Sequence, residues 1–333
     1  MSANIVNTLE ASPTKAFVAT GMTFADALTG SVLAAKQGAP LLLTHPTSAP
    51  SSVKSTIVNK NISDFVILGG TASVPQQTFN TLTGQEVAPP LAGKVIMLDP
   101  GHGGVDPGAV QNGYKEVDLN NSFTLKVASY LTQMGAQVLY TRNPNQNVYV
   151  SLEERANIAN SSNAEIFISI HHDSNVSSSP RGLSTHYSSY RPAIETTDVY
   201  VLSDGVKYPF ISENTDRKEF LVRDGSGTKA LSYTGNNIAY DPTPSVQAQN
   251  SKVLGEGLAQ SLQYPGVGIS NIYSSNGTKD HNLYVTRWTK MTSVLIELGF
   301  ISNPDEVKIL ANPTVQEQRA KAMAEQIKAF LTR

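Results

Sequence analysis

Four residues that could bind a metal ion or move a proton stand at the ends of predicted strands or at the start of a predicted helix. His102 follows an apolar run and lies in a glycine-rich turn, and His171 closes a second apolar run. Glu116 directly precedes a helical pattern, and Glu297 lies late in a third apolar run. Open α/β folds gather their ligands at the carboxyl ends of parallel strands, so we expect these side chains to lie at one sheet edge. Two imidazoles and two carboxylates suffice there for three zinc ligands and one general base, the open arrangement of hydrolytic zinc sites.

Taken singly, most of these residues have a simpler explanation. A lone histidine after a strand is more often a hydrogen-bonding residue than a ligand, and Glu116 could interact with a helix dipole. Glu297 is different, because an acid within an apolar strand is costly to bury without a partner. The four together favour a metal site, but the residues alone leave open which three are the ligands.

The composition excludes several other classes of protein and site. The chain has no cysteine, which excludes disulfides, thiolate zinc sites and cysteine nucleophiles. Its 25 Lys and Arg against 27 Asp and Glu exclude a strongly basic nucleic-acid binder and a polybasic membrane-surface protein. No run approaches the ~18 uninterrupted apolar residues of a membrane span. Any metal must therefore be held by Asp, Glu or one of six His.

The length of 333 residues and the alternation of strands with helices predict two α/β domains. We expect residues 1–88 to form a small Rossmann-like β/α layer, residues 89–93 a linker, and residues 94–333 a larger domain. The predicted strands are 16–20, 40–44, 65–68, 94–99, 137–141, 166–171, 283–285 and 293–298. The predicted helices are 24–36, 51–59, 74–82, 118–133, 151–160, 246–262, 304–310 and 314–331.

The larger predicted domain resembles the zinc-dependent N-acetylmuramoyl-L-alanine amidases of the amidase-3 family. The matching stretches are 98–104 (LDPGHGG), 106–109 (DPGA), 116–120, 141–142, 151–160, 167–171 (FISIH) and 297–303 (ELGFISN). The resemblance implies a twisted, mostly parallel sheet of about six strands flanked by helices. It also implies a secreted hydrolase that cleaves the amide between N-acetylmuramic acid and L-alanine in peptidoglycan, with one zinc ion per chain.

By the same resemblance, zinc is bound by His102, Glu116 and His171, and Glu297 is the catalytic acid and base. Asp99, Arg155 and Ser184 are expected to contact the substrate, although Arg155 more simply holds a helix and loops together.

Three features depart from the family pattern. His172 adjoins His171 and could compete as ligand, but consecutive strand residues face opposite ways, and the motif favours His171. Ser184 replaces the acid of the usual Gly-x-Glu-Thr element. Residues 187–249 interrupt the alternation with short β-like pieces, so we expect an insertion of hairpins or a long loop that walls the substrate groove or restricts access to it.

The N-terminal segment resembles one incomplete type 2 cell-wall-binding repeat. The matching stretches are 24–28, 33–35, 39–44 and 66–71, and the opening part of the repeat is missing. The resemblance implies weak binding of an anionic wall polymer. Met1 is followed by no signal-peptide pattern. We therefore expect this chain to be part of a longer secreted, wall-associated autolysin whose signal peptide is removed or truncated.

The sequence is also compatible with two alternatives to an amidase. One is another zinc peptidase acting further along the peptidoglycan stem, and the other is a non-catalytic wall-binding protein. In each case the expected partner is peptidoglycan, with no nucleic acid and no membrane span.

Overall fold

The computed structural model describes residues 2–8, 13–84, 88–233, 237–270, 272–273 and 275–333. The chain divides into two compact units, Met1–Ala88 and Pro89–Arg333. The predicted α/β fold class is confirmed, with a mostly parallel central sheet flanked by helices. None of the described helices combines the length and the apolar character that a membrane span requires.

The first unit is a small parallel sheet covered by helices. Its elements are α1 (Ser2–Thr8), β1 (Lys15–Thr20), α2 (Ala25–Lys36), β2 (Leu41–Thr44), α3 (Ser51–Asn59), β3 (Asp64–Ile67), α4 (Gly70–Ser73) and α5 (Gln76–Thr83). The strands lie in the order β2-β1-β3, all parallel. Strand β1 is almost wholly buried, as expected for a central strand covered on both faces.

The second unit is built on a six-stranded sheet with the order β15-β9-β16-β8-β4-β7. These strands are β4 (Val95–Pro100), β7 (Gln137–Tyr140), β8 (Ile166–Asp173), β9 (Ser184–Tyr187), β15 (Thr278–Asp280) and β16 (Thr292–Phe300). Among them β9 runs antiparallel to β16, whereas the other pairings are parallel. A short hairpin, β5 (Val110–Gln111) and β6 (Tyr114–Lys115), lies outside this sheet.

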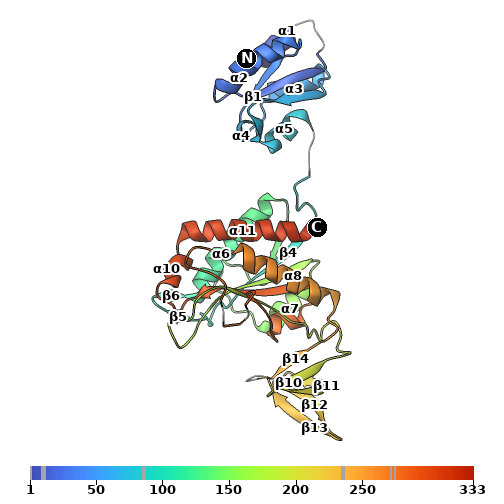
Figure 1. Ribbon diagram of the computed structural model, residues 1–333, viewed down its shortest axis with the longest axis vertical. Coiled ribbons are helices and arrows are strands. Elements are labelled where there is room, and N and C mark those ends of the chain that lie inside the picture. The colour runs from blue at the N-terminus through green and yellow to red at the C-terminus, as the bar shows by residue number, and fades with distance from the viewer. Residues whose placement is uncertain (1, 9–12, 85–87, 234–236, 271, 274) are drawn as a thin grey trace. The chain divides into compact units, whose positions relative to one another are not determined.

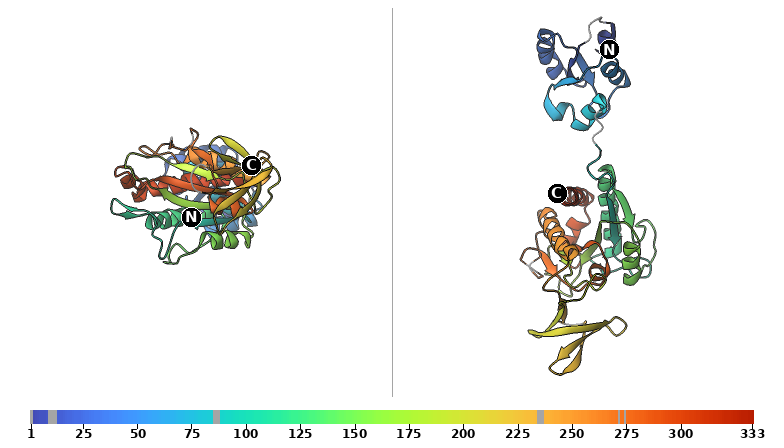
Figure 2. Two further views of the ribbon diagram at one scale, coloured as in Figure 1. Left: turned by 90° about the horizontal axis from the view of Figure 1, so that it is seen from below. Right: turned by 90° about the vertical axis from the view of Figure 1, so that its right-hand side faces the viewer.

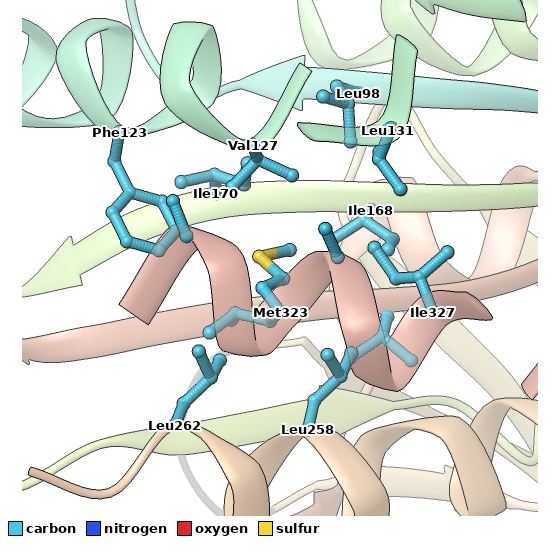
Figure 3. Packing of buried hydrophobic residues seen from close by; sticks show 14 of the residues in the cluster. Leu98, Phe123, Val127, Leu131, Ile168, Ile170, Leu258, Leu262, Met323 and Ile327 are labelled. Atoms are coloured by element: carbon cyan, nitrogen blue, oxygen red, sulfur yellow. The ribbon is translucent and has the colours of Figure 1, made fainter. Parts of the chain in front are cut away.

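Helices cover both faces of the six-stranded sheet. They are α6 (Glu116–Gln133), α7 (Leu152–Asn160), α8 (Val246–Ser261), α9 (Tyr284–Trp288), α10 (Glu306–Leu310) and α11 (Pro313–Leu331). Figure 3 shows residues of α6 and α11 packing against strand residues Leu98, Ile168 and Ile170, which forms the main core. A smaller cluster on the opposite face includes Phe167, Val285 and Leu295.

The prediction of a strand over 283–285 is wrong, because these residues begin helix α9. A short apolar run does not distinguish a strand from a buried helical turn. The edge of the sheet is formed instead by β15, which lies a few residues earlier and is less apolar. Strand β9 also had no counterpart among the predicted strands.

The predicted insertion is a separate antiparallel sheet of hairpins. Its strands are β10 (Tyr200–Ser203), β11 (Val206–Asn214), β12 (Glu219–Asp224), β13 (Gly227–Ser232) and β14 (Ile238–Tyr240), in the order β13-β12-β11-β10-β14. It projects from the second unit as a distinct sheet (Figure 1, Figure 2). Its own hydrophobic cluster includes Tyr190, Val201, Phe220 and Val222.

Candidate metal centre

The fold brings His102, Glu116 and His171 together at the carboxyl ends of β4 and β8. The Oε1 atom of Glu116 lies 3.0 Å from Nε2 of His102 and 2.9 Å from Nδ1 of His171. One candidate ligand atom from each residue lies within 4.8 Å of the others. Two nitrogen donors and one oxygen donor at this spacing form a donor set suited to a divalent transition metal ion.

His102 is held in an unusual backbone conformation by two guanidinium groups. Its φ angle is +63°, a left-handed region that a residue with a Cβ atom rarely occupies. Nε of Arg142 donates a hydrogen bond to the His102 carbonyl at 2.5 Å, and Nη2 of Arg155 donates to the same oxygen at 2.7 Å. These bonds offset the strain and set the direction of the imidazole.

Glu116 is the first residue of α6 and is almost fully buried. Its Oε2 accepts a hydrogen bond from the backbone N–H of Ala109, and its Oε1 accepts from the backbone N–H of His172. Burial opposes ionisation, but hydrogen bonds and charge from His102 and His171 hold the pKa of Glu116 well below its ordinary value. Glu116 is therefore a carboxylate at neutral pH, the form that binds a metal.

Asp106 orients the His102 ring from the other side. Its Oδ2 lies 2.8 Å from Nδ1 of His102. A proton held on Nδ1 by this carboxylate would leave Nε2, the nitrogen that faces Glu116, to bind a metal ion, the arrangement of a metal-binding histidine with an outer carboxylate. Burial opposes protonation, yet the hydrogen bonds that the ring donates to Glu116 and Asp106 raise the pKa of His102. In the sequence, Asp106 belongs to a matching stretch but had no predicted role, although its i+4 spacing from His102 is a signal that could have indicated one.

His172 points away from the cluster and into the protein. Its ring is fully buried, and Nδ1 lies 2.7 Å from Oδ1 of Asn120 on α6. Burial lowers the pKa of His172 to about 3, so this ring is neutral. The imidazole that lies beside Glu116 is therefore that of His171, whereas His172 reaches Glu116 only through its backbone N–H.

Glu297 lies on β16 in register with His171 on β8 and with Ser184 on β9. Cross-strand partners share one face of a sheet, so all three side chains lie on the same face. The Oε2 atom of Glu297 is buried and has no hydrogen-bond partner among the described residues. Burial, and then the charges of Asp173 and Glu116, raise the pKa of Glu297 well above its ordinary value. A carboxyl group whose pKa is raised in this way is suited to general acid–base catalysis.

The three residues expected to contact the substrate are buried, and two of them, Asp99 and Arg155, line the cavity beside the cluster. Nη1 of Arg155 pairs with Oδ1 of Asp99 at 2.6 Å, and both side chains are buried. Burial opposes ionisation of Asp99, but the Arg155 charge and hydrogen bonds from three side chains lower the pKa of Asp99. Ser184 is also buried, with its Oγ 3.1 Å from Nε2 of His186. These bonds anchor the three side chains, and their contact with substrate stays a prediction.

A cavity of about 330 Å³ opens beside the cluster. His102, Asp106 and His171 line one end, and the side walls include Tyr149 from the segment before α7 and Tyr284 from α9. Neither tyrosine was among the site residues predicted from the sequence. Tyr284 was hidden because its segment was expected to be a strand in the sheet, and nothing in the local pattern of Tyr149 distinguishes it from a loop residue.

Comparisons with known proteins relate both units of the chain to described families. Residues 96–329 match the family described as N-acetylmuramoyl-L-alanine amidase, and residues 1–79 match the family described as cell wall binding domain 2. The chain is 29% identical over 324 residues to the N-acetylmuramoyl-L-alanine amidase LytC of Bacillus subtilis, a match that covers 97% of this chain and 52% of LytC. It is 29% identical over 245 residues to the N-acetylmuramoyl-L-alanine amidase AmiC of Neisseria meningitidis, covering 71% of this chain and 52% of AmiC.

A solved structure shares the fold of the second unit. The amidase Ami1 of Mycobacterium smegmatis superimposes with a TM-score of 0.53 at 19% identity, covering 72% of this chain and 98% of Ami1. The chain spans about half the length of the two curated relatives described above.

Proposed function

The chain belongs to the N-acetylmuramoyl-L-alanine amidase family, and from that premise we propose that it hydrolyses the amide between N-acetylmuramic acid and L-alanine in peptidoglycan. The observation that carries the proposal is the placement of the partly buried acid Glu297 on the same sheet face as His171, a member of the cluster of His102, Glu116 and His171. The similarity to amidases of two bacteria over most of the second unit supports the same chemistry.

The cluster fits a zinc ion that we propose as the cofactor. A pair of imidazoles with one ionised carboxylate is a donor set of hydrolytic zinc sites, which leave a further position open. The Asp106 carboxylate behind His102 and the low pKa of Glu116 both favour ligands that are ready to bind metal. When bound, zinc supplies Lewis acidity that polarises a carbonyl group and lowers the pKa of water.

The chain's own residues then move the proton. We assign Glu297 as the base that takes a proton from the attacking water while the water oxygen bonds to the lactyl carbonyl carbon. The carbon–nitrogen bond breaks as protonated Glu297 returns that proton to the departing nitrogen of L-alanine. The products are a lactyl carboxylic acid on the glycan and a stem peptide with a free amine. The buried, unpartnered Oε2 and the raised pKa of Glu297 suit it to both steps.

The N-terminal unit is proposed to bind a polymer of the wall, which would make the protein extracellular and wall-associated. Its match to a cell wall binding family supports this assignment. Residues 1–88 contain four Lys (15, 36, 54, 60) and four acids (10, 26, 64, 86), so their formal charges cancel. Long-range attraction to an anionic polymer is therefore small, and we expect weak binding by this unit.

Mass spectrometry of purified peptidoglycan digested with the zinc-loaded protein tests the amidase proposal. Wild-type protein should release stem peptides that begin with L-alanine and leave the glycan intact. Glu297→Gln should lose more than about a thousandfold of this activity, at the upper range expected for a general acid–base group, while still binding zinc. Glu154→Gln, an exposed acid at the start of α7, is the matched control.

Three other results would replace the proposal. New ends within the stem peptide would make the protein a peptidase. Zinc binding without any product would favour a wall-binding protein. Loss of zinc from Glu297→Gln would make Glu297 a ligand instead of the proton carrier.

A further inference from the structure

The two flanks of the candidate centre differ in chemistry, and strand register places them on opposite sides of it. One row of cross-strand partners on the sheet face runs Asp99, Ser169, Leu295, His186 and Lys279, from β4 to β15. The flank over β4 and β8 leads to the cavity, the flank over β9 and β15 ends in polar and cationic groups, and β16 lies between the two flanks.

The cavity flank is predominantly apolar beyond its metal-binding end. Its apolar side walls are formed by Tyr149, Val150, Leu152, Leu283, Tyr284 and Val285. Tyr149 is 51% exposed and Leu152 is 55% exposed, so this wall is accessible from solvent. Neither phenol oxygen of the two tyrosines has a hydrogen-bond partner within the described part of the chain. The flank therefore offers aromatic faces with free hydroxyl groups at their edges.

Helix α9, which carries Tyr284, is fastened to the inserted sheet. Nη2 of Arg287 on α9 pairs with Oε1 of Glu213 on β11 at 2.7 Å, and both side chains are buried. The hydroxyl groups of Tyr190 and Tyr233 donate hydrogen bonds to the same carboxylate. The Tyr284 ring also packs on Trp288 with a centroid distance of 5.9 Å. The insertion thereby holds one wall of the cavity in position.

The opposite flank is polar and carries a cation. His186 lies between Ser184 and His281, with its Nε2 3.1 Å from Ser184 Oγ and its Nδ1 3.4 Å from His281 Nδ1. Its ring meets the ring of Tyr273 edge to face. The Nζ of Lys279 lies 5.7 Å from the centre of that tyrosine ring. Ser184 and His186 are buried, so the polar groups that this flank presents are the partly buried Asp173, which accepts a hydrogen bond from the Tyr273 hydroxyl, and the cation of Lys279.

We propose that the muramic acid ring of the substrate lies in the cavity between Tyr149 and Tyr284, an inference that rests on the proposed amidase function. In the same orientation, the stem peptide crosses β9 and β15 toward Lys279. A pyranose ring has an apolar C–H face that packs on aromatic rings and a hydroxyl rim that pairs with polar edges. A stem peptide carries carboxylates that a lysine attracts. The scissile amide joins these two parts, and Glu297 lies between the two flanks.

Hydrolysis of two synthetic substrates tests the saccharide site. One is N-acetylmuramoyl pentapeptide, and the other is the same peptide bearing only a lactoyl group. We expect wild-type protein to have the higher kcat/KM for the sugar-bearing substrate. Tyr284→Ala should lower the ratio of the two kcat/KM values by about tenfold, chiefly through KM. Tyr284→Phe, which keeps the ring, should retain most of the ratio.

Tyr200→Ala is the matched control, since Tyr200 belongs to the inserted sheet but not to the cavity wall. A ratio in Tyr284→Ala equal to that of wild type, or an equal change in Tyr200→Ala, would overturn the saccharide site. A wild-type protein that cleaves neither substrate would remove the amidase assignment, and the substrate orientation with it.

A second pair of substrates tests the peptide flank. They are muramoyl peptides whose second residue carries either a free or an amidated α-carboxyl group. Lys279→Gln should reduce the preference for the free carboxylate by about two- to fivefold, the worth of an exposed ion pair. Lys290→Gln, an exposed lysine outside both flanks, should not change that preference. If Lys279→Gln lowered kcat/KM by the same factor for both peptides, the assigned orientation of the stem peptide would be contradicted.

Discussion

Replacing Asp99 with Asn should destabilise the second unit strongly at neutral pH. The Asp99 carboxylate accepts hydrogen bonds from Thr141 at 2.5 Å, from Ser169 at 2.6 Å and from Arg155 at 2.6 Å. An asparagine oxygen can still face Arg155 and Thr141, and the Ser169 hydroxyl can turn to accept from the new amide. The charge, however, is lost, and the buried Arg155 is left without its counterion.

The magnitude follows from this change of charge. Removing one partner of a buried ion pair costs about 3–5 kcal/mol, because the remaining charge stays in a low-dielectric site. For a unit of this size, the loss corresponds to a fall in Tm of roughly 6–20 °C. Asp118→Asn, an exposed acid on α6, should change stability by less than about 0.5 kcal/mol and serves as the control.

The loss of stability in Asp99→Asn should also depend on pH, and the direction of that dependence follows from the shifted pKa of Asp99. The folded-state pKa of Asp99 lies below its ordinary value, so the carboxylate stabilises the fold fully above about pH 4. That stabilisation disappears as the pH falls through the lowered pKa, whereas the asparagine does not titrate. The stability difference between wild type and Asp99→Asn should therefore be constant near neutral pH and shrink in acid.

Urea unfolding, followed by tryptophan fluorescence from the single Trp288 of the second unit, measures this difference across a pH series. A loss below about 1 kcal/mol at pH 7 would refute the assignment of Asp99 and Arg155 as an energetically important buried pair. A loss that stays constant down to strongly acidic pH would show that its origin is not the Asp99 charge.

Further changes test the site and the insertion. Gly101→Ala should weaken zinc binding at least about tenfold, because a Cβ there would lie 2.2 Å from the His171 ring. Gly268→Ala is the control, since a Cβ at that position meets nothing within 4 Å. Equal zinc affinities of the two variants in isothermal titration would contradict this prediction. Glu213→Ala should lower the local stability by about 3–5 kcal/mol, because it leaves Arg287 buried and unpaired. Amide hydrogen exchange should then become faster in both β11 and α9. Faster exchange in β11 alone would show that the insertion does not hold the cavity wall. Treatment with a strong chelator should abolish amidase activity and added zinc should restore it, whereas full activity in metal-free protein would exclude the proposed cofactor.

The sequence alone was sufficient for the fold class and for most of the elements. The core strands β4, β8 and β16 are recognisable because parallel strands buried on both faces are continuous apolar runs. The long helices are recognisable from their three- and four-residue spacing of apolar side chains. The four residues selected for chemistry also stand out locally, since each precedes, follows, ends or interrupts such a pattern.

The tertiary structure decided which other groups surround those four residues. Tyr284 reaches the cavity because its segment coils as α9 and is anchored by Glu213, about 70 residues earlier in the chain. Asp106 turns the His102 ring, and His186 lies beside Ser184, only once strands and loops are placed in space. Periodicity reports what each segment buries, but it carries no information about which distant side chain fills a given space. The residues that carry the proposed chemistry are therefore recognisable in the sequence, whereas the walls of the cavity beside them arise from long-range packing.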